Sequence, residues 1–195
     1  RSELNLPEGN LVGCFGRIRP QKGVDIFIEI MITVCFQDPK AVAIICGQTT
    51  SDHMEFEARL KSRVADAGLS DRIIFLGTQP SDRLPLLFAS LDIYVAPQRN
   101  EGFGLTPLEA MASGVPVIAT TAGAFEEMVL NGQTGYIVEI EDIANMTKRL
   151  IELLSNETRR RALAKASIER VAQHFDIKGE AAALVRLYKD LLSKA

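Results

Sequence analysis

The sequence predicts an α/β fold: a Rossmann-like, doubly wound sheet of six parallel strands followed by C-terminal helices. Between residues 11 and 138 of the 195-residue chain, short apolar runs alternate with helix-like segments. This alternation is typical of β–α–β units, and the runs are too continuously apolar for a sheet with one face in water. After Glu141 the apolar residues recur only at helical spacing, so the chain is expected to end in helices.

The six apolar runs are bounded by turn-forming residues, as buried strands usually are. They lie at residues 11–15, 42–46, 73–76, 93–95, 117–119 and 136–138. The segments between them are expected to form helices at residues 24–36, 54–67, 85–90, 107–113 and 125–130. In the usual strand order of such a sheet, 3-2-1-4-5-6, the first and fourth strands are neighbours at the switch point where ligands bind.

Two apolar stripes mark the C-terminal helices. Because burial stabilises most helices, we expect both stripes to pack on the sheet; the alternative for the second is contact with a domain outside this chain. The first stripe comprises Ile143, Met146, Leu150, Ile151 and Leu154, and the second comprises Leu184, Leu187, Tyr188, Leu191 and Leu192.

The composition indicates one globular domain spanning residues 1–195, because the chain is 47% hydrophobic and 24% charged. Its net charge of -3 argues against a nucleic-acid surface, which needs a concentrated basic patch. The one dense basic run, residues 159–161, is expected to be a solvated helix face, with a membrane surface or a partner as the alternative. The most apolar stretch, residues 24–36, carries two acids and is too short to span a bilayer.

Cysteine and histidine usage argues against disulfides and against a zinc site. Cys14, Cys35 and Cys46 are odd in number and lie in apolar segments, so we interpret them as core residues of a protein in a reducing compartment. His53 and His174 are far apart in sequence, which is not the spacing of zinc ligands.

The most informative segment runs from Glu101 to Glu109, where two carboxylates seven residues apart bracket a Gly-Phe-Gly turn and a predicted helix start. Gly102 and Gly104 allow a tight turn that brings bare N–H groups close to a ligand. Thr106 is predicted to be the helix N-cap, followed by proline at the first helical position, and such a helix start suits a phosphate. Simpler interpretations stay open here: a Thr106-x-x-Glu109 capping box, a solvated Glu101, and glycines that only make a turn.

A second polar segment follows the first strand. Residues 16–23 read Gly-Arg-Ile-Arg-Pro-Gln-Lys-Gly and place Arg17 and Lys22 beside a helix start. At the switch point these cations would face the Glu101 turn, and together with a helix N-terminus they suit a diphosphate. The alternative is an ordinary basic loop. No P-loop is present and no Gly-x-Gly-x-x-Gly follows this strand, which disfavours a nicotinamide or flavin dinucleotide.

Together the two segments resemble the C-terminal domain of retaining GT-B glycosyltransferases, in the large family called group 1 or family 4. The resemblance is carried by Gly16-Arg17, Lys22-Gly23 and the run from Glu101 to Ala119, and it extends over nearly the whole chain. It implies that the chain is the donor-binding half of a two-domain enzyme whose N-terminal, acceptor-binding domain is absent. On its own such a fragment is expected to be inactive in transfer.

The resemblance also implies roles for particular residues. Arg17, Lys22 and Glu101 would be catalytic: the two cations bind the donor diphosphate and stabilise it as it leaves, and Glu101 contacts hydroxyls of the sugar. Glu109 would hold the ribose hydroxyls, N–H groups of residues 103–106 would line the sugar and phosphates, and backbone at residues 75–78 would receive the base. The implied nucleotide-sugar-binding set is Gly16, Arg17, Lys22, Leu76, Gly77, Thr78, Glu101, Gly102, Phe103, Gly104, Leu105, Thr106 and Glu109.

The implied activity is hexosyl transfer from a donor such as a UDP- or GDP-hexose, with no cofactor. No Asp-x-Asp occurs in the sequence and Arg17 and Lys22 offer positive charge, so a metal-independent reaction is expected. The expected partners are the donor and a lipopolysaccharide, lipid-linked or sugar acceptor, with no nucleic acid. The expected location is the cytoplasm, with peripheral attachment to the inner face of the membrane left open. The alternatives are a GT-B-like nucleotide-sugar epimerase, a phosphorylase and a noncatalytic nucleotide-sugar-binding module.

Overall fold

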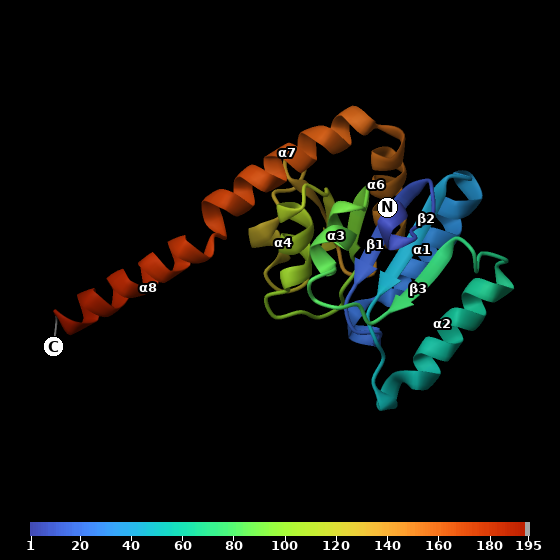
Figure 1. Cartoon of the computed structure of the whole chain (residues 1–195), viewed down its shortest axis with the longest axis horizontal. Helices are drawn as coiled ribbons and strands as arrows, with labels where there is room; N and C mark the ends of the chain where they lie inside the picture. The colour runs from blue at the N-terminus through green and yellow to red at the C-terminus, as the bar shows by residue number, and fades with distance from the viewer. Residues whose placement is uncertain (194–195) are drawn as a thin grey trace.

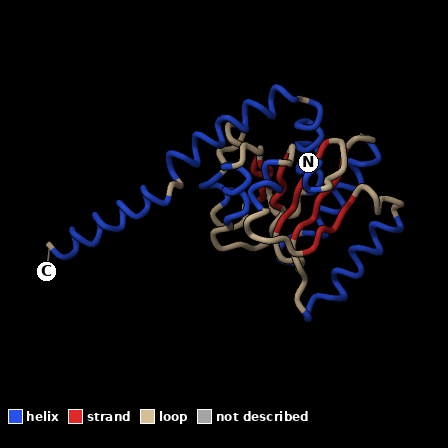
Figure 2. The backbone as a smooth tube through the Cα atoms, viewed as in Figure 1, coloured by secondary structure: helices blue, strands red, loops and turns tan. Residues whose placement is uncertain are grey.

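The computed structural model describes residues 1–193, in which six parallel strands form one sheet in the order β3-β2-β1-β4-β5-β6 (Figure 2). The predicted α/β class, the six strands and their order are therefore confirmed. The strands are β1 (Asn10–Phe15), β2 (Ala41–Cys46), β3 (Ile73–Gly77), β4 (Ile93–Ala96), β5 (Val117–Thr120) and β6 (Gly135–Val138). The α-helices are α1 (Val24–Gln37), α2 (Met54–Asp66), α3 (Leu84–Ala89), α4 (Leu105–Ala112), α5 (Phe125–Met128), α6 (Ile143–Ser155), α7 (Glu157–His174) and α8 (Ile177–Leu192).

Helices cover both faces of the sheet. Side chains of α1, α2 and α6 form one apolar cluster with the strands, and side chains of α3, α4 and α5 form a second. Leu11 and Val12 are consecutive and fully buried, yet they belong to different clusters, because successive side chains of a strand point to opposite faces. This two-sided burial explains why the strands are continuously apolar in the sequence.

The first C-terminal stripe packs as predicted except at its first member, Ile143, which is 38% exposed. Met146 and Leu150 of α6 are buried, and α6 packs against α1. The three cysteines are also buried, as expected of core residues. Within residues 1–193 no helix is long and apolar enough to cross a membrane.

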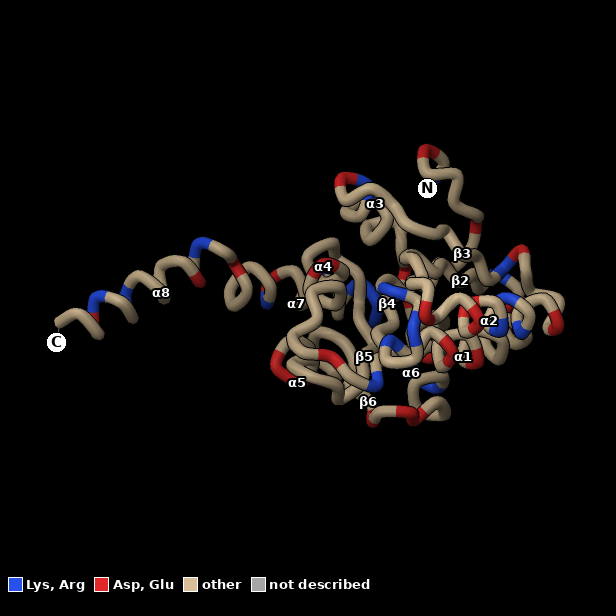
Figure 3. The backbone as a smooth tube through the Cα atoms, turned by 90° about the horizontal axis from the view of Figure 1, so that it is seen from below, with Lys and Arg blue, Asp and Glu red and all other residues tan. Residues whose placement is uncertain are grey.

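The second stripe does not pack on the sheet, so that prediction is wrong. Figure 1 shows α8 extending away from the domain beyond the end of α7, and none of the residues of α8 is buried. Leu184 is 45% exposed and Leu187 is 52% exposed. Along the same helix both basic and acidic residues occur (Figure 3). The apolar spacing identified an amphipathic helix but not the surface that covers it.

The basic run at residues 159–161 is not the solvated face that the sequence predicts. Arg160 donates to the last carbonyl groups of α6 at 2.5 and 2.7 Å. Arg159 donates at 2.7 Å to a carbonyl in the turn before β6. Only Arg161 of this run is exposed, and it pairs with Glu157 one helical turn away. Two of the three guanidinium groups therefore join structural elements and are already occupied.

Matched leucine substitutions in α6 and α8 test this description. Leu150 is fully buried, so Leu150→Ala should lower the free energy of unfolding by about 2–5 kcal/mol through lost burial and a residual cavity. Leu184→Ala is the control on the exposed helix and should change it by less than about 0.5 kcal/mol. Urea unfolding measures both. A loss above about 1.5 kcal/mol from Leu184→Ala would mean that α8 is packed in solution.

Candidate functional site

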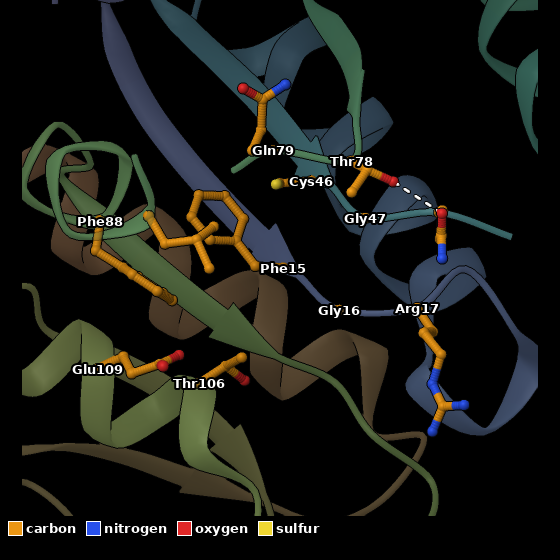
Figure 4. A pocket seen from close by; sticks show the side chains of 12 residues that line it. Phe15, Gly16, Arg17, Cys46, Gly47, Thr78, Gln79, Phe88, Thr106 and Glu109 are labelled. Atoms are coloured by element: carbon orange, nitrogen blue, oxygen red, sulfur yellow. Dashed lines mark hydrogen bonds between the residues drawn. The ribbon is translucent and has the colours of Figure 1, made fainter. Parts of the chain in front are cut away.

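The carboxyl ends of the strands carry the candidate site. β1 pairs with β2 on one side and with β4 on the other, so the segments that leave β1 and β4 begin side by side. A cavity of about 240 Å³ opens between the ends of β1, β2 and β3 and helix α4 (Figure 4). Doubly wound sheets bind ligands at this position. The cavity is lined by Phe15, Gly16, Arg17, Cys46, Gly47, Gln48, Thr78, Gln79, Leu84, Phe88, Thr106 and Glu109.

Three glycines end the strands beside this cavity. The N–H of Gly16 donates to the Cys46 carbonyl at 2.8 Å, and the N–H of Gly47 donates to the Gly77 carbonyl at 2.9 Å. A Cβ on Gly47 would lie 1.9 Å from the Gly16 carbonyl oxygen, so no larger residue fits there. A Cβ on Gly16 or Gly77 would meet no atom within 4 Å. The strand ends therefore present bare backbone to open space.

Two glutamines make hydrogen bonds at the ends of β2 and β3, one with a side chain and one with the backbone. The Thr78 hydroxyl donates to Gln48 Oε1 at 3.0 Å, and Gln79 Nε2 donates to the Leu76 carbonyl at 2.8 Å. Of the predicted residues here, Thr78 lines the cavity, whereas the Leu76 side chain packs in the core. Sequence reasoning missed both glutamines, because a glutamine after a strand has no distinguishing spacing.

Helix α4 begins earlier than the sequence predicts. Its N-cap is Gly104, with φ 83°, and its first residue is Leu105. The predicted Thr106 N-cap is therefore wrong, as is the alternative of a Thr106–Glu109 capping box, and proline lies at the third helical position instead of the first. Glycine reaches this backbone conformation without steric cost, which lets the helix start directly after the turn. Pro107 is tolerated because first-turn N–H groups have no helical acceptor.

The start of α5 and the two residues before it pack against the Gly-Phe-Gly turn. A Cβ on Gly104 would lie 2.4 Å from the ring of Phe125, and a Cβ on Gly123 would lie 2.4 Å from the Gly102 carbonyl oxygen. The N–H of Ala124 donates to the same Gly102 carbonyl at 3.2 Å. Sequence reasoning missed this support, because Gly123 and Phe125 fit an ordinary turn and an ordinary core position.

Lys22 and Glu101 form a direct ion pair between the two predicted segments. Their side chains are only 17% and 16% exposed. Lys22 ends a short 3₁₀ helix at Pro20–Lys22, and Glu101 also accepts the N–H of Gly102 at 3.2 Å. The expected convergence of the first and fourth strand ends is therefore confirmed, whereas a solvated Glu101 is wrong. With little water around it, this pair is a stronger interaction than a surface ion pair.

Glu109 and Thr106 approach the cavity from α4. Figure 4 shows both side chains directed into it from the side opposite Thr78 and Gln79. Partial burial at this mouth raises the pKa of the Glu109 carboxyl above its ordinary value of 4.5. Among residues 1–193, Ser113 donates to the backbone carbonyl of Glu109 but no donor pairs with its carboxylate, so the carboxylate oxygens are available to hydroxyl donors.

The other predicted residues lie around this centre. Arg17 is exposed at the edge of the cavity (Figure 4). The side chains of Phe103 and Leu105 are 51% and 63% exposed and line a different cavity, of about 820 Å³, between α4 and the corner where α7 meets α8. Only the backbone of these two residues belongs to the predicted site. Within residues 1–193, no group of three or more His, Cys, Asp or Glu side chains is arranged to hold a metal ion.

Arg99 and Glu141 are further residues that sequence reasoning missed. Arg99 lies two residues before Glu101 and contacts the segment after β1 through both its side chain, which donates to the Pro20 carbonyl, and its backbone N–H, which donates to the Gln21 carbonyl. Glu141 follows β6 and accepts from Arg99 Nε at 2.7 Å. It has φ 66°, a left-handed conformation that costs a residue with a side chain about 1–3 kcal/mol. The signal in the sequence is slight, since both belong to charged loops.

Most of the chain is similar to known proteins of one family. The family model described as glycosyl transferases group 1 matches residues 1–170. The chain is 44% identical over 188 residues to the lipopolysaccharide core biosynthesis mannosyltransferase LpsB of Rhizobium meliloti, which covers 95% of this chain and 53% of that protein. The corresponding enzyme LpcC of Rhizobium leguminosarum is 42% identical, with 53% of its length covered. The chain thus spans about half the length of the curated relatives it matches.

Solved structures share the fold. The C-terminal domain of the glycosyl transferase group 1 family protein LpcC from Francisella tularensis has a TM-score of 0.86 and 36% identity, covering 90% of this chain and 91% of that one. HepE of Anabaena, in complex with UDP, has a TM-score of 0.88 and 26% identity, covering all of this chain and 51% of its own. Since the family model covers most of the chain and a family domain shares its fold at 36% identity, the chain belongs to the glycosyl transferases of group 1.

Proposed function

We propose that the chain is the donor-binding half of a retaining hexosyltransferase that takes a nucleoside diphosphate hexose. The observation that carries this proposal is the contact of Lys22 with Glu101 at the switch point, beside the start of α4. A cation, a carboxylate and a helix N-terminus in one place match the diphosphate and the hydroxyls of a nucleotide sugar.

In this proposal the donor lies across the cavity from the strand ends to the Glu101 turn. The base lies near Gly77 and Thr78, and Glu109 accepts hydrogen bonds from the ribose hydroxyls. The diphosphate lies between Lys22, Arg17 and the first N–H groups of α4, and Glu101 binds hydroxyls of the hexose. Backbone N–H groups of residues 102–106 complete the set. Gly16 lets the diphosphate approach the chain that leaves β1, because it carries no side chain.

The same groups would assist the transfer. Breaking the bond between sugar and phosphate puts positive charge on the sugar and negative charge on the departing diphosphate. Lys22, Arg17 and the α4 N–H groups are preorganised to stabilise that negative charge, a role that other enzymes give to a metal. We therefore propose a metal-independent reaction. The retaining outcome and the placement of the acceptor on a second domain are inferred from the family resemblance.

The relatives refine the proposal. The two curated relatives are named as lipopolysaccharide core mannosyltransferases, which favours mannose as the hexose and lipopolysaccharide core as the acceptor. HepE was solved with UDP, so a uridine donor is the competing choice. We propose that the enzyme works in the cytoplasm, where nucleotide sugars are available, and that any contact with the membrane is made through the other domain.

Calorimetry with UDP, GDP and ADP, each with and without an attached hexose, tests the donor site. One base series should bind at millimolar concentration or below, and the hexose-bearing form should bind more tightly because it adds the Glu101 contacts. Glu109→Ala should weaken every member of that series while circular dichroism stays unchanged. Absence of binding throughout the panel, with a folded chain, would contradict the proposed function.

Opposite effects are expected at the two ends of the ion pair. Lys22→Ala should weaken nucleoside diphosphate binding about 10- to 100-fold, or about 1.4–2.7 kcal/mol, but barely affect the nucleoside. Glu101→Gln should instead tighten binding of the diphosphate without sugar about 3- to 10-fold, because Lys22 no longer pairs with a carboxylate. The same substitution should reduce the gain from an attached hexose. Weakening of both ligands by Glu101→Gln would contradict the assignment.

The raised pKa of Glu109 gives a prediction that links stability to binding. Since its charged form is disfavoured in the folded state, Glu109 costs stability above its ordinary pKa of 4.5. Glu109→Gln should therefore raise the free energy of unfolding at pH 7, and the gain should shrink as pH falls through the folded pKa and below 4.5. Nucleotide binding should weaken meanwhile. Glu126→Gln, at an exposed acid of α5, is the control and should change neither; a less stable Glu109→Gln at pH 7 would refute the argument.

A further inference from the structure

We propose that Arg99 is a positioning residue that sets the spacing between Lys22 and Glu101, an inference that rests on the proposed function of those two residues. Its guanidinium grips the carboxylate of Asp25 with both ends, Nη1 to Oδ1 and Nη2 to Oδ2, each at 2.8 Å. A two-pronged contact of this kind fixes orientation as well as distance. Asp25 lies in the first turn of α1, directly after the segment that carries Lys22.

The remaining donors of Arg99 extend the same connection. Nη1 also donates to the Pro20 carbonyl at 2.7 Å, and Nε donates to Glu141 at 2.7 Å. Pro20 begins the 3₁₀ turn that ends at Lys22, and Glu141 follows β6. One side chain thus joins the segments that follow β1, β4 and β6, which reach the same edge of the sheet.

The backbone repeats this connection. The N–H of Arg99 donates to the Gln21 carbonyl at 2.9 Å, and the N–H of Asn100 approaches the same oxygen at 3.4 Å. Gln21 is next to Lys22, and Asn100 is next to Glu101. Backbone contacts at the neighbouring residues therefore hold Lys22 and Glu101 close to each other, independently of the ion pair between their side chains.

The surroundings of Arg99 argue against a direct role on the donor. Two carboxylates and a carbonyl occupy its guanidinium, so it is already neutralised. Arg17, by contrast, is exposed at the cavity and makes no salt bridge within residues 1–193. Glu141, which accepts the hydrogen bond from Arg99 Nε, has the unfavourable left-handed backbone conformation. Arg99 accordingly acts through Lys22 and Glu101, and Arg17 is the arginine that meets phosphate.

Ligand binding to Arg99→Ala tests this positioning role. Calorimetry compares GDP-mannose with GMP, and UDP-glucose with UMP, since the monophosphates do not reach Glu101. Arg99→Ala should weaken binding of the nucleotide sugar about tenfold and binding of the nucleoside monophosphate less than about twofold. Only the nucleotide sugar needs Lys22 and Glu101 to be correctly spaced. Arg99→Lys should recover only part of this loss, since an ammonium cannot hold both oxygens of Asp25.

The control is Arg63→Ala. Arg63 makes the same two-pronged contact with Glu29, at 2.8 and 2.9 Å, between α2 and α1 and outside the cavity. Arg63→Ala should leave the affinities for the monophosphate and for the nucleotide sugar unchanged. If Arg99→Ala weakened binding of the nucleoside monophosphate and of the nucleotide sugar equally, the proposal would be overturned, and normal binding of both would overturn it too.

A ligand-free measurement separates this inference from the proposed function. A double-mutant cycle with Lys22→Met and Glu101→Gln gives the coupling of the pair in the unfolding equilibrium constant. In the Arg99→Ala background this coupling should fall at least about threefold. If the unsubstituted chain binds no nucleotide, the proposed function fails and the cycle alone decides the positioning role; unchanged coupling overturns it. Should Arg99→Ala not fold, Arg99→Lys and Glu141→Gln replace it, with smaller losses in the same direction expected and no loss contradicting the proposal.

Discussion

The close approach of two chain segments at Gly23 and Pro97 is the constraint on which the site depends. A Cβ at position 23 would lie 2.0 Å from the Pro97 carbonyl oxygen, and φ is 67° there, so only glycine allows the contact. Because β1 and β4 are neighbours in the sheet, this contact brings the turn after β1 against the chain that leads into α4. Lys22 and Glu101 then meet although 79 residues separate them. The strand order determines which segments meet, and the lack of a side chain at Gly23 determines how closely they approach.

Much of this arrangement could be predicted from the sequence, because it follows from burial and topology. The apolar runs identify strands buried on both faces, and the strand order brings Lys22 to Glu101. What could not be predicted depends on local backbone choices and on partners. The start of α4 depends on the conformation of Gly104, which the capping pattern at Thr106 conceals. The spacing in α8 reports an apolar face without its covering surface, and Arg99 has no spacing that separates it from a solvated loop residue.

The arginines show why a count of charges is a poor guide to a binding surface. Arg72 donates to the carbonyl groups of Cys35, Asp38 and Ala41, and so holds the turn between α1 and β2. Arg99 and Arg160 also spend their donors on carbonyls and carboxylates of this chain. A guanidinium offers five donors in one plane, which suits it to fixing loops that lack regular hydrogen bonding. The donors of these three guanidinium groups are already occupied within residues 1–193, so they add to the count of positive charges without adding to a binding surface.

The pairing of Lys22 with Glu101 has a consequence for turnover. In the proposed function, a hexose attached to the diphosphate would offer hydroxyl groups to Glu101, and Lys22 would then turn to the diphosphate. Once the sugar had left, the carboxylate would lose those donors and compete with the diphosphate for the same ammonium, in a place where little water screens either charge. Departure of the sugar would thus loosen the hold on the spent nucleotide. The contact between Lys22 and Glu101 would then also help to expel the product.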